Sequence, residues 1–167
     1  MANLKGKDGS FLVLFKDSSK KEIFLIFRTD YPIWSVTGGG IEPGETPKKA
    51  ATRETIEETG FKFKITRKIG IYKYFYKNTY LFEGQYLSGK YKPEFSENIG
   101  KWFPVNQIPI DITSATRRKI VDATTSQDQP FVVKIKNELS FISNVGLIFR
   151  HPFAFFTFIK KNFHATN

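Results

Sequence analysis

The sequence contains no cysteine among its 167 residues. This absence excludes disulfide bonds and any metal site built from thiolates, but it does not by itself indicate a compartment. Histidine is nearly absent as well, since His151 and His164 are the only two. Neither has a metal-ligand partner at a useful spacing, and we expect structural or solvent-facing roles for both. A nucleophilic triad based on histidine is therefore not supported.

The chain also has no apolar segment ahead of its first predicted strand, so no signal peptide is visible. Residues 139–159 approach the length of a membrane span, but Arg150 and Pro152 lie near the middle of that stretch. A charged side chain in the hydrocarbon of a bilayer is costly, so we do not interpret the stretch as a span. We expect a cytoplasmic protein.

The composition of the chain is that of one globular domain with a basic surface. Hydrophobic residues make up 40% of the sequence and charged residues 25%, which are ordinary globular values. The net charge is +10. A basic surface attracts polyanions, so nucleotides, RNA and anionic membranes all fit, and a charge that serves only solubility is the competing interpretation.

A glycine-rich loop followed by a helix is the most informative part of the sequence. Thr46 can cap a helix, and Pro47 suits the first turn, where the missing N–H has no cost. Gly60 is a natural C-terminal stop. These signals predict a helix over residues 47–59, preceded by a loop that includes the run of glycines at positions 38–40.

Three glutamates share one face of this predicted helix. Glu54, Glu57 and Glu58 are spaced i, i+3 and i+4, so their side chains project from the same side. Carboxylates crowded in this way repel one another, and a cation between them removes the repulsion. Clustered oxygen ligands suit Mg²⁺, with Mn²⁺ as an alternative, whereas a solvated acidic helix face is the competing interpretation.

This stretch resembles the Nudix box of the Nudix hydrolases, which here spans residues 39–61. The family pattern is Gly-x5-Glu-x7-Arg-Glu-U-x-Glu-Glu-x-Gly-U, in which U is an apolar residue. All of its fixed residues are present at the right spacing, namely Gly39, Glu45, Arg53, Glu54, Glu57, Glu58 and Gly60. Thr55 stands at an apolar position, where we expect a slightly looser helix contact but no loss of activity. Thr37 stands where related chains frequently have proline.

The resemblance implies roles for the matching residues. Arg53 would orient the glutamates, Glu45 would hold the loop against the helix, and Glu54 would bind a metal ion or take a proton from the attacking water. The implied catalytic residues are Glu54, Arg53 and Glu57. The implied metal ligands are Glu54, Glu57, Glu58, a backbone carbonyl of Gly39, and Glu97. The implied substrate-binding residues are Arg28 and Tyr76, and the structural residues of the box are Glu45 and Gly60.

The three residues outside the box depend on looser parts of the resemblance. Related chains commonly have a glutamate several residues before a Trp-Phe strand, and Glu97 fits that position, with Glu94 as the alternative. Arg28 closes a predicted strand at a place where an arginine often lies near the substrate phosphates. Tyr76 stands where dinucleoside polyphosphate hydrolases often have a tyrosine. For Arg28 and Glu97 an ordinary exposed charge is the competing interpretation, whereas for Tyr76 it is a sheet face packed on a helix.

The fold implied by the resemblance is the Nudix α/β/α sandwich, an α/β (mixed α+β) architecture with a mixed sheet between helices. Hydrophobic patterning agrees with this fold class. It predicts strands over residues 10–16, 22–28, 33–36, 61–77, 80–87 and 131–136, a turn at Asn78 and Thr79, and a second helix with a basic face over residues 113–124. We assign residues 1–136 to a Nudix hydrolase domain. Residues 137–167 form an apolar, basic extension that packs on the domain or on a partner.

The implied reaction is Mg²⁺-dependent hydrolysis of the diphosphate linkage in a nucleoside diphosphate derivative. Nucleoside triphosphates, dinucleoside polyphosphates and nucleotide sugars all remain open as substrates, so the expected partner is a small-molecule nucleotide. One alternative is a Nudix-fold module that binds nucleotides or RNA without cleaving them. Another is recruitment to a membrane surface through the C-terminal extension. Neither nucleic acid nor a membrane is favoured as a partner, and a homodimer through the apolar extension remains open.

Overall fold

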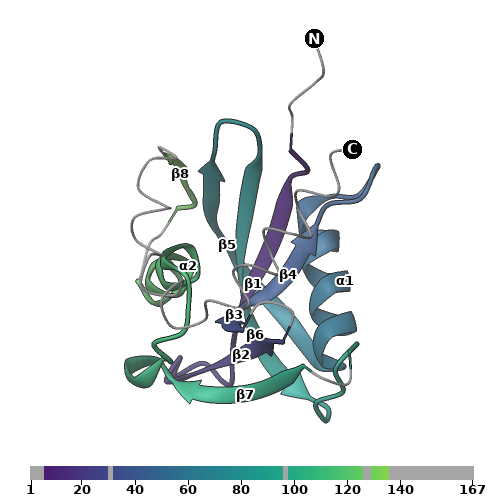
Figure 1. The fold of residues 1–167 in the computed structure, drawn as a ribbon, viewed down its shortest axis with the longest axis vertical. Helices are drawn as coiled ribbons and strands as arrows, with labels where there is room; N and C mark the ends of the chain where they lie inside the picture. The colour runs from purple at the N-terminus through teal and green to yellow at the C-terminus, as the bar shows by residue number, and fades with distance from the viewer. Residues whose placement is uncertain (1–5, 30–31, 96–97, 126–128, 136–167) are drawn as a thin grey trace.

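A mixed β-sheet with one helix on each face forms the centre of the structure (Figure 1). The computed structural model describes residues 6–29, 32–95, 98–125 and 129–135. The strands are β1 (Gly9–Phe15), β2 (Glu22–Arg28), β3 (Ile33–Ser35), β4 (Thr37–Gly40), β5 (Lys62–Lys73), β6 (Asn78–Ser88), β7 (Ile99–Pro104) and β8 (Phe131–Lys134). The helices are α1 (Pro47–Thr59), the short 3₁₀ helix η1 (Val105–Gln107) and α2 (Ser114–Thr124).

The sheet has the strand order β3-β2-β1-β6-β5-β8, with β4 paired to β1 and β7 paired to β2. The pairing of β1 with β6 is parallel, as is that of β5 with β8, and the other pairings are antiparallel. The sheet is therefore mixed, and the predicted fold class is confirmed. In the described part of the chain, no helix is both long enough and apolar enough to cross a membrane.

Strand β1 is buried on both faces and separates two apolar clusters. Val13 and Phe15 pack into the cluster that includes Ile120 of α2, whereas Leu12 packs into the cluster that includes Ala51 of α1. Successive side chains of a strand point to opposite faces, so both clusters draw on the same short segment. This arrangement explains why β1 is an apolar run without polar alternation.

The glycine run is a strand and not the loop that the sequence predicts. Residues 37–40 form β4, which pairs with β1 so that Gly38 lies opposite Phe11. Gly38 has a φ of 135°, and a Cβ placed on it would lie 2.3 Å from the carbonyl oxygen of Ser10. Only glycine can adopt this backbone and allow this approach, so the glycines serve strand pairing as well as the site.

The predicted turn at Asn78 and Thr79 is also wrong, because both residues belong to β6. The chain reverses over residues 74–77, where the N–H of Tyr74 donates to the carbonyl oxygen of Lys77 at 2.9 Å. The backbone N–H of Asn78 donates to Asp8 Oδ1 at 2.7 Å, which ties Asn78 into the sheet. A contact between residues so far apart in the chain leaves no local sequence signal.

The predicted second helix is present as α2, but its basic face is incomplete. Arg117 and Arg118 are exposed, whereas Lys119 is 8% exposed and its Nζ lies 3.6 Å from the centroid of the Phe11 ring. Burial lowers the pKa of Lys119 to about 8. The predicted C-terminal extension, residues 137–167, lies outside the described residues.

Candidate active site

Helix α1 carries the site, and both of its ends are formed by the residues that the sequence indicates. The Thr46 hydroxyl accepts a hydrogen bond from the N–H of Lys49 at 3.3 Å, and Pro47 occupies the first turn. At the other end Gly60 is left-handed, with φ 68° and ψ 7°, and its N–H donates to Ile56 O at 2.7 Å. The predicted helix over residues 47–59 is therefore confirmed.

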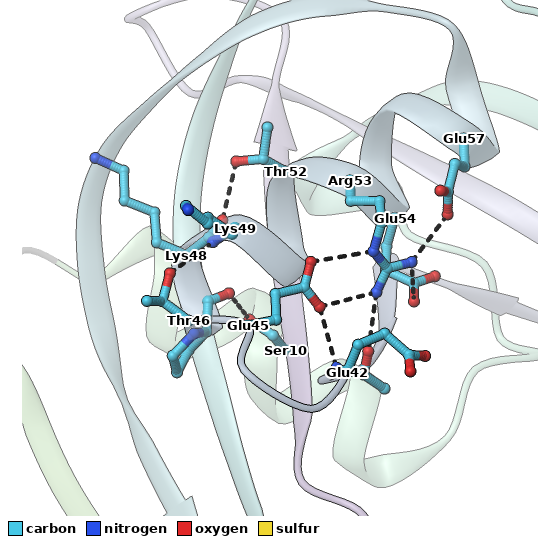
Figure 2. Close-up of polar contacts among 12 residues, drawn as sticks. Ser10, Glu42, Glu45, Thr46, Lys48, Lys49, Thr52, Arg53, Glu54 and Glu57 are labelled. Atoms are coloured by element: carbon cyan, nitrogen blue, oxygen red, sulfur yellow. Dashed lines mark hydrogen bonds and ion pairs between the residues drawn. The ribbon is translucent and has the colours of Figure 1, made fainter.

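Arg53 contacts three carboxylates and one carbonyl at the same time (Figure 2). Its Nε and Nη2 donate to the two carboxylate oxygens of Glu45, both at 3.1 Å. Its Nη1 donates to Glu54 Oε1 at 2.9 Å and to Glu57 Oε2 at 3.0 Å, and Nη2 also reaches Gly40 O at 3.1 Å. A planar guanidinium group can hold several oxygens in a fixed arrangement, which is the geometry that orienting the glutamates requires.

Glu45 joins the loop to the helix through this same guanidinium group. Its Oε2 also accepts the backbone N–H of Glu42 at 3.1 Å, and the N–H of Glu45 donates to Glu42 O at 3.0 Å (Figure 2). The hydrogen bonds from Arg53, and then the one from the Glu42 backbone, lower the pKa of Glu45. Glu45 therefore remains ionised and links the turn before α1 to the side chain of Arg53.

The carboxylate of Glu54 lies directly against Gly39 of β4. A Cβ placed on Gly39 would lie 2.4 Å from Glu54 Cδ and 2.5 Å from each of its carboxylate oxygens. No real side chain tolerates such distances, so the absence of a side chain at this position makes room for Glu54. Arg53 Nη1 donates to Glu54 from α1, which limits how the carboxylate can turn.

Glu58 is the most perturbed carboxyl group of the box. It is partly buried, and one of its oxygens accepts the N–H of Gly38 at 2.9 Å. Its pKa is raised to about 7, mainly by burial and also by the negative charges of Glu54 and Glu94, while the Gly38 N–H and Arg28 oppose the shift. The charges of Arg28 and Glu94 therefore act on Glu58, and the predicted substrate-binding role of Arg28 stays a prediction.

The donor set of this site fits a hard divalent cation. The side chains offer only carboxylate oxygens, and the repulsion that helps to raise the pKa of Glu58 beside Glu54 is what a cation would relieve. Among the residues that the structure describes, no three acidic or histidine side chains surround a single point closely enough to hold an ion. Arg53 holds Glu54 and Glu57 by hydrogen bonds, and the Glu57 side chain is 43% exposed.

For two residues of the predicted site, the structure does not establish a position beside the carboxylates of the Nudix box. Glu97 lies outside the described residues, so its predicted role stays a prediction. Tyr76 lies at the exposed tip between β5 and β6, with its ring edge-on to Phe75 at 4.7 Å. In the sheet, β1 lies between β4 and β6, the second strand of that hairpin. The substrate-binding role of Tyr76 stays a prediction.

Sequence reasoning missed several residues that form the site. The N–H of Gly38 holds Glu58, and the glycine run was the only signal for it. Thr37 and Thr55 depart from the family pattern, yet their hydroxyl oxygens lie 2.8 Å apart. Tyr91 lies close enough for the Glu58 charge to raise the pKa of its phenol, which is raised mainly by burial, and no local pattern marks this tyrosine.

Comparison with known proteins supports the resemblance to the Nudix hydrolases. Residues 6–124 match the family model described as the NUDIX domain. A Bacillus subtilis protein named "Putative 8-oxo-dGTP diphosphatase" is 33% identical over 130 residues, a match that covers 75% of this chain and 86% of that protein. Diphosphoinositol polyphosphate phosphohydrolase 2 from Rattus norvegicus is 43% identical over 60 residues, but the match covers only 35% of this chain and 34% of the rat protein.

Solved structures agree on the fold. The crystal structure of an ADP-ribose pyrophosphatase from Streptococcus suis superimposes with a TM-score of 0.61 at 19% sequence identity. The superposition covers 76% of this chain and 98% of the Streptococcus suis chain. At this identity the likeness concerns the arrangement of strands and helices, and it carries no information on the substrate.

Proposed function

This chain belongs to the NUDIX domain family and is a hydrolase that acts on pyrophosphate bonds, and from this premise we propose that it cleaves a nucleoside diphosphate derivative with the help of Mg²⁺ or Mn²⁺. The observation that carries the proposal is the convergence of Glu54 and Glu57 on one nitrogen of Arg53, at 2.9 and 3.0 Å. Two carboxylates that already meet around one positive charge can also meet around a metal ion.

We assign the metal to Glu54, Glu57 and Glu58, with the carbonyl of Gly39 as a backbone ligand. When bound, a divalent cation neutralises phosphate charge and makes its bound water more acidic. The chain's own contribution is to orient the carboxylates. Arg53 does so for Glu54 and Glu57, and the N–H of Gly38 does so for Glu58.

The chemical step that we propose is attack of water on a phosphorus atom of the diphosphate. The water oxygen forms the new P–O bond, the bond from that phosphorus to the bridging oxygen breaks, and the bridging oxygen leaves with the second phosphate group. Glu54 takes the proton of the attacking water, directly or through the carboxylate network. Its position against Gly39 and its bond to Arg53 keep its carboxylate in one orientation for this task.

For the substrate, we propose a nucleoside triphosphate as the first candidate. The Bacillus subtilis relative, which this chain matches over most of its length, is named for 8-oxo-dGTP. The diphosphoinositol relative matches over a third of its length, so it gives less support for a non-nucleotide substrate. Dinucleoside polyphosphates and nucleotide sugars remain in the panel of compounds to test.

The experiment is a hydrolysis screen of purified protein against this panel, with Mg²⁺, with Mn²⁺ and with EDTA. We expect release of phosphate, pyrophosphate or a nucleoside monophosphate only when a divalent cation is present. Glu54→Gln and Glu57→Gln should each lower kcat by about 10²-fold or more. Glu22→Gln is the matched control, because Glu22 forms a surface ion pair with Lys16 at 2.7 Å away from the box.

Unchanged turnover in both box variants would refute these roles. Nucleotide binding without turnover over the whole panel would instead favour a binding module.

We also propose that residues 1–136 form the hydrolase domain, because β8 pairs with β5 beyond the end of the family match at residue 124. Packing of residues 137–167 on the domain or on a partner, like a cytoplasmic location, stays a prediction.

A further inference from the structure

The hairpin of β5 and β6 ends in a four-residue tip, residues 74–77. With 12 and 11 residues, β5 and β6 are the longest strands in the described part of the chain. Figure 1 shows the tip projecting beyond β8 at one end of the sheet. The N–H of Tyr74 donates to Lys77 O at 2.9 Å and closes the tip. Phe75 and Tyr76 therefore occupy the point at which the chain reverses.

Neither the turn nor the core accounts for the rings of Phe75 and Tyr76. Tight turns favour glycine, asparagine and aspartate, so two aromatic residues do not serve the turn itself. Phe75 is 83% exposed and Tyr76 is 45% exposed, and their rings meet edge to face at 4.7 Å. Tyr74, one residue earlier, packs against the core cluster. The tip therefore presents a pair of rings that no other described residue covers, which indicates a contact outside the domain.

Three exposed lysines, which we call the basic rim, adjoin this tip: Lys73, Lys77 and Lys134. Lys73 is the last residue of β5 and lies beside Lys134 of β8 in the strand register. Among the described residues, no carboxylate forms an ion pair with any member of the rim. Asp8 also lies at this end of the sheet, but its two oxygens accept hydrogen bonds from Asn78 at 2.7 and 3.2 Å. The rim therefore leaves uncompensated positive charge next to the exposed rings.

Exposed rings beside unpaired lysines match the chemistry of a membrane surface that contains anionic lipids. Aromatic rings are favoured at the depth of the lipid headgroups, and lysines near such a surface are attracted to the lipid phosphates. A single-stranded nucleic acid fits less well, because successive bases need ring faces spaced along a basic groove. Here one ring packs edge-on against the other at a projecting turn.

We propose that the tip of the β5–β6 hairpin is a contact site for the surface of an anionic membrane. The rings of Phe75 and Tyr76 enter the headgroup layer, and the basic rim binds the lipid phosphates. This site is separate from the C-terminal extension, through which the sequence offers membrane recruitment as an alternative. The inference goes beyond the proposed function and does not depend on it, because no residue of the Nudix box takes part.

The test is sedimentation of the full chain with vesicles of phosphatidylcholine alone or of equal parts phosphatidylcholine and phosphatidylglycerol. We expect binding to the anionic vesicles only, and this binding should weaken as the salt concentration rises. Phe75→Ser should lower the affinity for anionic vesicles by about tenfold, because the transfer of one ring out of water is lost. Lys73→Gln/Lys77→Gln should lower it by at least about tenfold, since each lysine at such a surface contributes a factor of about five.

The other end of the same hairpin supplies the matched controls. Leu87 is 55% exposed near the end of β6, and Lys62 and Lys64 are exposed near the start of β5. Leu87→Ser removes an exposed apolar side chain, and Lys62→Gln/Lys64→Gln removes the same charge as the double variant of the rim. We expect both to bind anionic vesicles within about twofold of the wild type, because charges beyond a Debye length from the surface act weakly.

Fluorescence of a Phe75→Trp variant reports insertion of the tip directly. The native Trp34 and Trp102 pack against other rings, so the wild type gives the background signal. Anionic vesicles whose phosphatidylcholine chains carry bromine should quench the Phe75→Trp variant beyond this background, because its indole enters the interface. They should not do so for Leu87→Trp. Circular dichroism verifies that each variant folds.

Several results would overturn the inference while leaving the proposed function in place. They are no wild-type binding to anionic vesicles, wild-type affinity in Phe75→Ser, equal losses in the control variants, and no added quenching in Phe75→Trp. Oligouridylate binding that is lost in the tip variants, without vesicle binding, would assign the tip to RNA. A dimer that Phe75→Ser disperses, again without vesicle binding, would assign it to a second copy of the chain. Lower nucleotide turnover in Phe75→Ser with unchanged vesicle binding would assign it to the substrate, as the sequence predicts for Tyr76.

Discussion

Thr37 and Thr55 form a buried pair of hydroxyl groups, 2.8 Å apart, that joins β4 to α1. Both residues are 0% exposed, and Thr37 also donates to Leu12 O at 3.2 Å, so Thr55 is the donor within the pair. These are the two positions at which the sequence departs from the usual pattern around the Nudix box. The structure therefore shows a hydrogen-bonded contact where the sequence predicts a looser one.

This pair predicts a non-additive effect on stability. Thr37→Val should lower the free energy of unfolding by about 1–3 kcal/mol, because it leaves the buried Thr55 hydroxyl without a partner. Thr55→Val should cost less, because the Thr37 hydroxyl keeps its bond to Leu12 O. The double variant Thr37→Val/Thr55→Val should cost less than the sum of the two, by about 1 kcal/mol. Urea unfolding of the wild type, the two single variants and the double variant measures this difference. Strictly additive costs would show that the bond between the two hydroxyl groups contributes nothing to stability.

The contact between Gly39 and Glu54 predicts a specific loss of activity. In Gly39→Ala the new methyl group would push the Glu54 carboxylate out of place, so we expect kcat to fall by at least about tenfold. Gly44→Ala is the control, since Gly44 has a φ of 78° but a Cβ placed on it would meet no atom within 4 Å. It should cost about 1–2 kcal/mol of stability through backbone strain and leave kcat unchanged.

Steady-state kinetics and thermal unfolding of both glycine variants separate the two effects. A Gly39→Ala protein with wild-type kcat would contradict the assigned role of Glu54. An equal loss of kcat in Gly44→Ala would show that activity follows general stability and not the position of the carboxylate.

The raised pKa of Glu58 predicts a dependence of stability on pH. Between pH 4.5, the ordinary value, and about 7, the folded chain keeps a proton on Glu58 that the unfolded chain has lost. The free energy of unfolding should therefore fall as the pH rises through this window. Glu58→Gln removes this contribution, so its stability should fall less than that of the wild type.

Urea unfolding of both proteins in EDTA at pH 5, 6 and 7.5 gives the comparison. Mg²⁺ should restore stability to the wild type at pH 7.5, because a cation favours the ionised carboxylate. Parallel pH profiles for the wild type and Glu58→Gln would contradict the burial of a protonated carboxyl group at this position.

The parts of the structure that local signals control could be predicted from the sequence. Thr46, Pro47 and Gly60 determine the ends of α1 through capping bonds within a few residues, so the bounds of the helix are confirmed. The spacing of Glu54, Glu57 and Glu58 depends only on helix geometry and is equally local. The ion pair between Arg53 and Glu57, one turn apart, follows once the helix is placed.

The parts that depend on distant pairing could not be predicted. The glycines of β4 form a strand because β1 approaches them closely, and Asn78 joins β6 because it bonds to Asp8 across 70 positions of the chain. Lys119 is buried because it packs over Phe11, and Tyr91 is anchored because Gly100 leaves room for its ring. In each case the second partner comes from a distant part of the chain, so no pattern around the first residue reveals it.

The central claim is that the carboxylates of α1 gather a divalent cation beside a bound diphosphate. The most direct measurement is the anomalous scattering of Mn²⁺ in crystals of the full chain soaked with Mn²⁺ and a non-hydrolysable nucleoside triphosphate. We expect an anomalous peak within ligand distance of Glu57 and Glu58, bridging them to a phosphate oxygen. Bound nucleotide with no Mn²⁺ peak beside these two glutamates would contradict the claim.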